Sequence, residues 1–251
     1  MQTTTTTTTT CLPTPEMTLS AIALRSDAHA TVLHRYKLDF CCRGSRTLGD
    51  ACRSAGVDVD RVLAALTAEA NARQDARSAA VDWHGRPLGE LIDFIVSTHH
   101  DYTRSAFARL APLAAKVAGK HGAVHAELAR VAATFEELAE DLTSHMLKEE
   151  RMLFPYIRAL AGPGGAPAAP FGTVRNPVHM MMREHDRAAD LLVTLAGATA
   201  DFSPPEDACP SFRALYAGLA ELRLDLLKHI SLENNVLFPQ AVALETATAR
   251  R

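Results

Sequence analysis

The chain has 251 residues, 47% of them hydrophobic and 22% charged, which is an ordinary composition for a globular protein with a sizeable core. A formal net charge of −3 gives no reason to expect nucleic acid as a partner, and no apolar run approaches the roughly 20 residues that cross a bilayer. The five cysteines are odd in number and scattered, which favours a reducing cytoplasm over a disulfide framework.

The first third of the chain divides into three sections. Residues 1–16 begin with a threonine run that lacks the positive start and apolar middle of a secretory signal, and they are expected to be a disordered tail. Residues 17–72 carry short helical signals, starting with a helix over 19–36. Thr47 is the expected N-cap and Gly56 the expected stop of the next helix. These residues predict a small helical domain, and residues 73–86 a polar connector.

Residues 87–245 carry long helical periodicity. Pro87 suits a first helical position, and the apolar residues after it recur at intervals of three and four. A second helix should run from about 122 to Pro155, which is expected to end or kink it, and two more should cover about 177–198 and 205–243. Short connections between four helices predict an all-α fold with an antiparallel four-helix bundle.

The bundle region contains one pattern twice. Glu149 follows His145 by four residues and Glu233 follows His229 by four, and both pairs continue into Leu-Phe-Pro after the same interval. No other histidine in the chain is followed by a glutamate at that spacing. A His-Asp dipeptide precedes each pair by 45 and 44 residues, at His100 and His185. This spacing predicts a duplicated helical hairpin.

Residues four apart in a helix project from the same face, so each His–Glu pair can point into the bundle. With His100 and His185 also pointing inward, the interior receives four imidazoles and two carboxylates, which predicts a two-metal site. A single His–Glu pair is usually a surface contact worth about 0.2–0.5 kcal/mol, but that reading does not explain the repetition. Imidazole and carboxylate suit iron or manganese better than zinc.

A bond count indicates that such a site would be reactive. Four imidazoles, two bridging carboxylates and an oxo or hydroxo bridge would leave about one open position on each of two six-coordinate ions. A small molecule such as dioxygen or nitric oxide, or a transferred ligand, would bind there. Asp141, Glu184 and Asp225 lie near the ligand histidines in the sequence. They are expected either to orient imidazoles or relay protons, or to be solvated charges.

Three phrases of this region, residues 144–150, 184–186 and 225–239, resemble the hemerythrin-like di-iron proteins of the repair-of-iron-centres family. The stretch from 36 to 44, with 47 onward, resembles the small helical domain that precedes the bundle in that family. The resemblance covers nearly the whole chain after the threonine run. It implies two non-haem iron ions joined by an oxo or hydroxo bridge. The terminal ligands that it implies are His100, His145, His185 and His229, and the bridging carboxylates are Glu149 and Glu233.

The family resemblance also implies a function and partners. Proteins of this family are associated with restoring iron–sulfur clusters damaged by nitric oxide or oxidants, by donating iron. This implies damaged iron–sulfur proteins as partners and a role in the stress response. A nitric oxide reductase, and a sensor or carrier that binds dioxygen or nitric oxide, are the alternatives. The sequence leaves open the client proteins, the resting oxidation state of the iron and the oligomeric state, a homodimer included.

Two local features need separate expectations. His99 adjoins His100 and should face about 100° away, so only one of the two is expected to aim at the core, and the resemblance favours His100. Cys41 and Cys42 are followed by Arg43 and Gly44 where the family has two glycines, and Arg43 is expected to lower a thiol pKa. The pair is either a redox or an iron- or nitrosyl-handling site, or two small buried hydrophobes. Cys11, Cys52 and Cys209 are expected to be structural or incidental.

Overall fold

The computed structural model describes residues 12–72, 83, 85–162 and 169–248. The chain divides into two compact units, residues 1–81 and 82–251, and each is described by itself. The start of the expected tail, residues 1–11 with Cys11, and most of the expected connector, residues 73–82 and 84, lie outside the described residues. Trp83 and residues 85–86 of the connector are described, and Trp83 is buried against Phe94 with 4.9 Å between ring centroids.

The first unit is a small helical domain. Its helices are α1 (Leu19–Ala23), α2 (Asp27–Arg35), α3 (Leu48–Ala55) and α4 (Val59–Ala72). The expected helix over 19–36 is divided because the hydroxyl of Ser26 caps a new helix by accepting from the backbone N–H of His29. Thr47 caps α3 as expected, and Gly56 ends it in the left-handed conformation at φ 66°.

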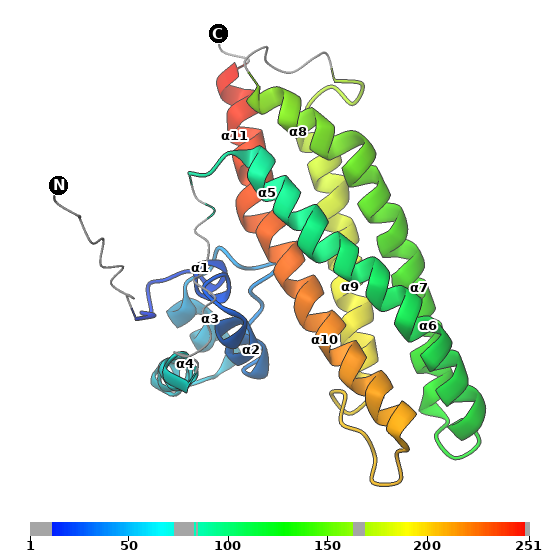
Figure 1. Ribbon diagram of the computed structural model, residues 1–251. Coiled ribbons are helices and arrows are strands. Elements are labelled where there is room, and N and C mark those ends of the chain that lie inside the picture. Colours follow the sequence, from blue (N-terminus) through cyan, green and yellow to red (C-terminus); the bar gives the residue numbers. More distant parts are fainter. Residues whose placement is uncertain (1–11, 73–82, 84, 163–168, 249–251) are drawn as a thin grey trace, which may run out of the picture. The chain divides into compact units, whose positions relative to one another are not determined.

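The second unit is a four-helix bundle, and Figure 1 shows its long helices running side by side. Its helical segments, in chain order, are α5 (Leu88–Phe94), η1 (Ile95–His100), α6 (Asp101–His121), α7 (Glu127–Lys148), η2 (Glu149–Leu153), α8 (Phe154–Ala161), α9 (Arg175–Ala198), α10 (Pro210–Leu232), η3 (Glu233–Leu237) and α11 (Phe238–Thr248). Helix α6 packs against α7 and α10, and α7 packs against α9. Apolar residues of α6, α7, α9 and α10 are buried together in one core, so the predicted bundle is confirmed.

Three short π-helical turns interrupt the long helices, and each of them contains or begins at a predicted metal ligand. His100 ends η1, Glu149 begins η2 and Glu233 begins η3. A π turn bonds each backbone N–H five residues back instead of four, and such turns are frequent at functional sites. The duplicated phrase therefore has a duplicated backbone irregularity at its glutamates.

Pro155 was expected either to end or to kink its helix, and it does not end it. The helix continues from α7 through η2 into α8, and the proline lies in the first turn of α8. A proline in a first turn costs little because its missing N–H would have no intrahelical partner there. The π turn η2 comes directly before α8, so Pro155 lies at the start of a new α-helical segment. In the same way η3 comes directly before α11, in which Pro239 lies.

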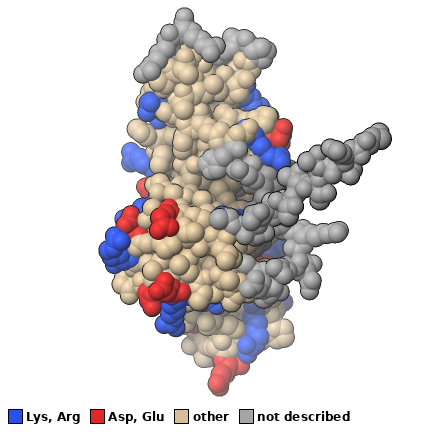
Figure 2. All heavy atoms as spheres, turned by 90° about the vertical axis from the view of Figure 1, so that its left-hand side faces the viewer, with Lys and Arg blue, Asp and Glu red and all other residues tan. Residues whose placement is uncertain are grey.

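No helix in the described ranges is long and apolar enough to span a membrane. On the face that Figure 2 shows, basic and acidic side chains are interspersed among uncharged ones. Exposed ion pairs in the described ranges include Arg53 with Asp50 and Arg86 with Glu90.

Candidate di-metal site

Six buried side chains meet in the middle of the bundle, and they are the six that the sequence predicted as metal ligands. η1 supplies His100, α7 supplies His145 and α9 supplies His185. The fourth imidazole, of His229, comes from α10, and the two glutamates begin η2 and η3. Each of the six is at most 1% exposed, so the polar atoms of the cluster are shielded from water.

The six residues form two groups that share both glutamates. One group is His100, His229, Glu149 and Glu233, and the other is His145, His185 and the same two glutamates. Within each group the ligand atoms all lie within 4.8 Å of one another. The imidazole nitrogens face each other in pairs, with 3.1 Å between Nε2 of His100 and His229 and 3.0 Å between Nε2 of His185 and His145.

Each glutamate reaches one histidine of each group. Oε2 of Glu149 lies 3.4 Å from Nε2 of His100 and 3.3 Å from Nε2 of His145. The two oxygens of Glu233 divide between the groups, with Oε1 3.1 Å from Nε2 of His229 and Oε2 3.1 Å from Nε2 of His185. This is the arrangement expected of carboxylates that lie between two ions.

The donor set fits two metal ions. All four carboxylate oxygens of Glu149 and Glu233 are buried without a hydrogen-bond partner. A buried carboxylate is costly unless a positive charge or several donors compensate it, and two of them side by side are costlier still. Cations between the carboxylates and the four imidazoles would supply that compensation, and no cysteine is among the ligands to favour a thiolate site.

The charges in the cluster are strongly coupled. Burial and the neighbouring carboxylate of Glu233 oppose ionisation of Glu149, but the imidazoles of His145 and His100 outweigh them and lower its pKa. The pKa of Glu233 is lowered well below its usual value, because His229 and His185 outweigh the effect of burial. Burial alone would lower the pKa of His145, but Glu149, Glu184 and Glu233 raise it to about 10.

Three of the four imidazoles are held from behind by an outer hydrogen-bond acceptor. Nδ1 of His100 donates to Glu150 at 2.6 Å, and Nδ1 of His145 donates to Glu184 at 2.8 Å. Nδ1 of His185 donates to the amide oxygen of Asn234 at 2.9 Å. Such partners fix the orientation of a ligand imidazole and raise its basicity.

The remaining imidazole, that of His229, differs from these three. Its Nδ1 is buried and has no hydrogen-bond partner. Two outer carboxylates are themselves paired with cations, Glu150 with Arg104 and Glu184 with Lys148. The two ligand groups are therefore unequal in their surroundings: both imidazoles of the group with His145 and His185 have an outer partner, and only His100 of the other group has one.

The three acids expected near the ligands have different environments. Glu184 contacts the ligand His145, as expected. Asp141 follows the second alternative expected for it, a solvated charge: its exposed carboxylate accepts from the guanidinium of Arg187, which lies on the neighbouring helix α9. Asp225 contacts an imidazole, but it is that of His99 and not that of its own-helix neighbour His229, with Nδ1 of His99 3.0 Å from Oδ1.

The expectation that only one of the two adjacent histidines turns inward is also wrong. His99 and His100 are both buried, because both lie in the π turn η1, where the turn is wider than in an α-helix. Only His100 joins the ligand groups. The ring of His99 stacks on that of His229 at 5.7 Å between centroids and 5° between planes. His179, which lies on the same helix as His185, is exposed.

Two of the residues that accept from the ligand imidazoles, Glu150 and Asn234, were not predicted from the sequence. A signal for them exists: each directly follows the glutamate of the duplicated phrase, so the two occupy the same position of the repeat. They come from a helix other than that of their histidine. The spacing within one helix could therefore not reveal them.

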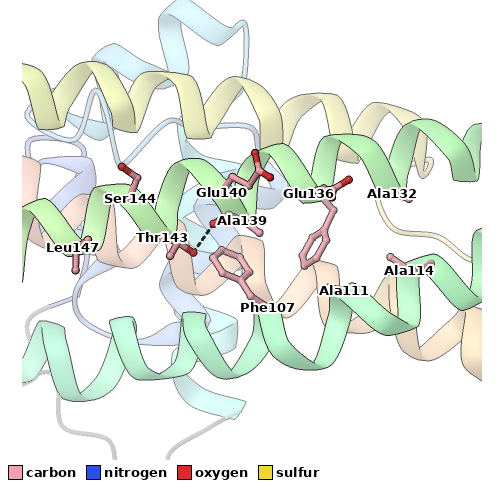
Figure 3. Close-up of a pocket in the computed structure, with 12 residues that line it drawn as sticks. Phe107, Ala111, Ala114, Ala132, Glu136, Ala139, Glu140, Thr143, Ser144 and Leu147 are labelled. Atoms are coloured by element: carbon pink, nitrogen blue, oxygen red, sulfur yellow. Dashed lines mark hydrogen bonds between the residues drawn. The ribbon is translucent and has the colours of Figure 1, made fainter.

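A groove of about 710 Å³ lies beside the site, between α6 and α7. Figure 3 shows Phe107 of α6 directed toward Ala139 and Thr143 of α7. Alanines form much of its lining, and none of the six predicted ligands belongs to it. The groove therefore does not open directly onto the ligand groups.

The cysteine pair lies in the first unit. Sγ of Cys41 is 3.5 Å from Sγ of Cys42 and 3.2 Å from Oδ1 of Asp39. Arg43 was expected to lower a thiol pKa, but the pKa of Cys41 is strongly raised by the hydrogen bond with Cys42, by burial and by the charge of Asp39. The arginine next in sequence is exposed, and water screens its charge.

Known proteins share both units. The family model of the hemerythrin HHE cation binding domain matches residues 91–241, and that of a domain of unknown function, DUF542, matches residues 15–70. The iron-sulfur cluster repair protein YtfE of Yersinia pseudotuberculosis serotype IB (strain PB1/+) is 37% identical over 224 residues, which are 89% of this chain and 96% of that protein. YtfE of Yersinia pestis (strain Pestoides F) matches with the same identity and coverage. With both domains and a relative of this similarity over nearly its full length, the chain belongs to the hemerythrin-like repair-of-iron-centres family.

Proposed function

We propose that this protein repairs damaged iron–sulfur clusters by holding two non-haem iron ions in the bundle and giving up iron to the damaged protein. The observation that carries the proposal is the pair of ligand groups that share Glu149 and Glu233. The similarity to proteins named for iron–sulfur cluster repair supports the choice of substrate. The partners would be cytoplasmic proteins whose clusters nitric oxide or oxidants have attacked.

In this proposal the two imidazoles of each group would hold one ion, Glu149 and Glu233 would be shared between the ions, and an oxo or hydroxo group would complete the centre. The carboxylates are already lined up for this role, because each lies within 3.4 Å of one imidazole of each group. When bound, the iron pair supplies ferrous ions for rebuilding a cluster.

The outer residues determine how firmly each position holds its ion. Glu184 and Asn234 hold both imidazoles of one group, whereas only His100 of the other group has such a partner. Loss of an outer partner typically lowers metal affinity by about 10- to 100-fold. We therefore assign the more labile iron to the position formed by His100 and His229.

The test uses the full chain loaded anaerobically with ferrous iron and a purified dehydratase whose cluster has been nitrosylated or oxidised. Recovery of dehydratase activity is measured in the presence of a chelator that removes free iron. Wild type should restore activity, Glu149→Gln should not, and Glu140→Gln, an exposed change on the same helix, should behave as wild type. Recovery that the chelator abolishes would contradict donation by the protein.

The same samples separate donation from the alternatives. If the loaded protein consumes nitric oxide and releases nitrous oxide without restoring the dehydratase, it is a reductase. If it binds nitric oxide or dioxygen reversibly and does neither, it is a sensor or carrier. Either result would replace the repair function.

A further inference from the structure

Asp39, Cys41 and Cys42 bring three potential metal ligands together outside the bundle. Their ligand atoms all lie within 4.8 Å of one another. The two sulfur atoms are 3.5 Å apart, and Oδ1 of Asp39 is 3.2 Å from Sγ of Cys41. A disulfide would bring the sulfurs to about 2.05 Å, so the two residues are present as thiols.

The backbone holds this segment on both sides. Before it, Lys37 adopts the left-handed conformation at φ 57°, and the N–H of Leu38 donates to the carbonyl of Leu33, which ends α2 and redirects the chain. After it, the N–H groups of Leu19 and Ser20 donate to the carbonyls of Arg46 and Gly44. Within it, the N–H of Cys42 donates to Oδ1 of Asp39 at 2.9 Å. The carboxylate and the thiols are therefore positioned before any ligand arrives.

The separations match those around a tetrahedral ion. With metal–sulfur bonds of about 2.3 Å, two thiolates on such an ion are about 3.8 Å apart, and with a metal–oxygen bond of about 2.1 Å a thiolate and a carboxylate oxygen are about 3.6 Å apart. The observed values of 3.5 Å and 3.2 Å differ from these by a few tenths of an ångström. Small side-chain rotations would complete the geometry.

We propose that Asp39, Cys41 and Cys42 form a second metal site, which binds one divalent ion of the borderline class that thiolates and carboxylates share, zinc(II) or iron(II). On binding, each thiol loses its proton to solvent and its sulfur forms a bond to the ion, so one ion releases two protons and no electron is transferred. The donor set differs from that of the bundle, which has no thiolate.

Three protein ligands leave one of four tetrahedral positions for an exchangeable ligand. The site is accessible for such exchange, because Asp39 is exposed and Cys42 is half-buried, although Cys41 is buried. A closed structural site would instead use four protein ligands. The geometry is thus that of a site from which an ion can be passed on, and this inference does not depend on the function proposed for the bundle.

Cobalt(II) is the probe for this site, used on the reduced full chain under anaerobic conditions. Cobalt bound by thiolates gives a sulfur-to-metal charge-transfer band in the near ultraviolet, and imidazole or carboxylate ligands do not. In wild type the intensity of this band should correspond to one thiolate-bound cobalt per chain, in addition to any cobalt that the bundle takes up without such a band. Cys42→Ser, a change at a half-buried position, and Asp39→Asn, which keeps the acceptor for the backbone bond, should weaken binding by about tenfold or more.

Two controls separate this site from the rest of the molecule. A Cys11→Ser/Cys52→Ser/Cys209→Ser variant should keep the band, and so should Glu149→Gln/Glu233→Gln, whatever becomes of the bundle metals. Zinc(II) and iron(II), added in separate arms, should each remove the band, and the one that does so at the lower concentration is the preferred ion. The proposal is overturned if wild type shows no charge-transfer band, if the band survives Cys41→Ser/Cys42→Ser, or if neither ion displaces cobalt.

Discussion

The two halves of the bundle repeat the same ligands but surround them differently. His145 and Glu149 of the first half correspond to His229 and Glu233 of the second. His145 donates to Glu184, which is also paired with Lys148, whereas Nδ1 of His229 has no partner. Glu184 directly precedes His185 in the second half, and the corresponding residue of the first half is His99, which directly precedes His100. The ring of His99 stacks on that of His229, and its Nδ1 donates to Asp225.

This difference shows how a duplicated hairpin can produce an asymmetric site. In the proposed site Glu149 and Glu233 would contact both ions, and an exchange of either would disturb the whole cluster. Outer residues touch one imidazole each and can differ between the halves at lower cost. The comparison predicts that changes at the shared glutamates affect both metal positions and changes at outer residues affect one.

The largest effect is expected for Glu149→Gln. Its carboxylate belongs to both ligand groups, and an amide cannot supply a negative charge between two ions, so the iron content should fall from two to below one per chain. Glu140→Gln on the same helix is the matched control and should retain two. Iron content is measured by elemental analysis after gel filtration. A Glu149→Gln protein with two tightly held ions would break the assignment of this residue as a bridge.

Glu184→Gln should have the next largest effect, and only on one position. Removal of the charge behind His145 should lower the affinity of that ion by about 10- to 100-fold. Asp141→Asn is the control, since Asp141 lies one turn before His145 but contacts Arg187 instead. Competition with a chelator measures both variants, and equal losses in the two would contradict the role given to Glu184.

Iron uptake should also depend on pH. The pKa of His145, raised to about 10, means that in the metal-free protein this imidazole carries a proton at neutral pH, which a bound ion must displace. The affinity for iron should therefore fall by about tenfold for each pH unit below the pKa of His145. The folding stability of the metal-free protein depends on pH in the opposite direction. The raised pKa of His145 stabilises the folded state fully below the unfolded pKa of 6.5, and this stabilisation is lost as the pH rises through about 10.

The thermal midpoint of the metal-free protein measures that second effect. It should decrease between pH 7 and 10, and the decrease should be smaller in Glu184→Gln, because Glu184 is one of the groups that raise the pKa of His145. A midpoint that rises over this range would show that His145 is not protonated in the folded protein.

The smallest effect is expected for His99→Gln, which sharpens the comparison between the halves. A glutamine in the repeat position of Glu184 can accept from Nδ1 of His229 and still donate to Asp225. The labile ion should then be released more slowly, by a few-fold, under a fixed concentration of chelator. If release is unchanged, the missing partner of His229 is not the cause of the asymmetry.

The sequence predicts the bundle and the two His–Glu pairs from spacing within single helices, His100 and His185 from the repeat, and the choice of His100 over His99 from the family resemblance. His145 and Glu149 are one turn apart, and the repetition at His229 and Glu233 makes a chance match implausible. The π turns cannot be predicted from the spacing of residues, because their wider backbone hydrogen-bond pattern follows from tertiary packing. The burial of both His99 and His100 and the continuation of the helix beyond Pro155 are consequences of these turns.

The outer contacts are the second part that the sequence does not specify. Asp141 and Asp225 occupy the same position of the repeat, yet Asp141 pairs with Arg187 and Asp225 with His99. Which neighbour each one meets depends on what the adjacent helix presents at that level. The missed partners Glu150 and Asn234 likewise reach histidines on other helices.

The central claim is that the six residues hold two ions in unequal positions. Anaerobic loading of the Cys41→Ser/Cys42→Ser variant with iron-57, followed by elemental analysis and Mössbauer spectroscopy, tests it most directly, because the thiol pair then cannot contribute metal. The account predicts two irons per chain and two quadrupole doublets of equal area, one of which disappears first under a chelator. One iron per chain, or two that leave together as a single species, would contradict it.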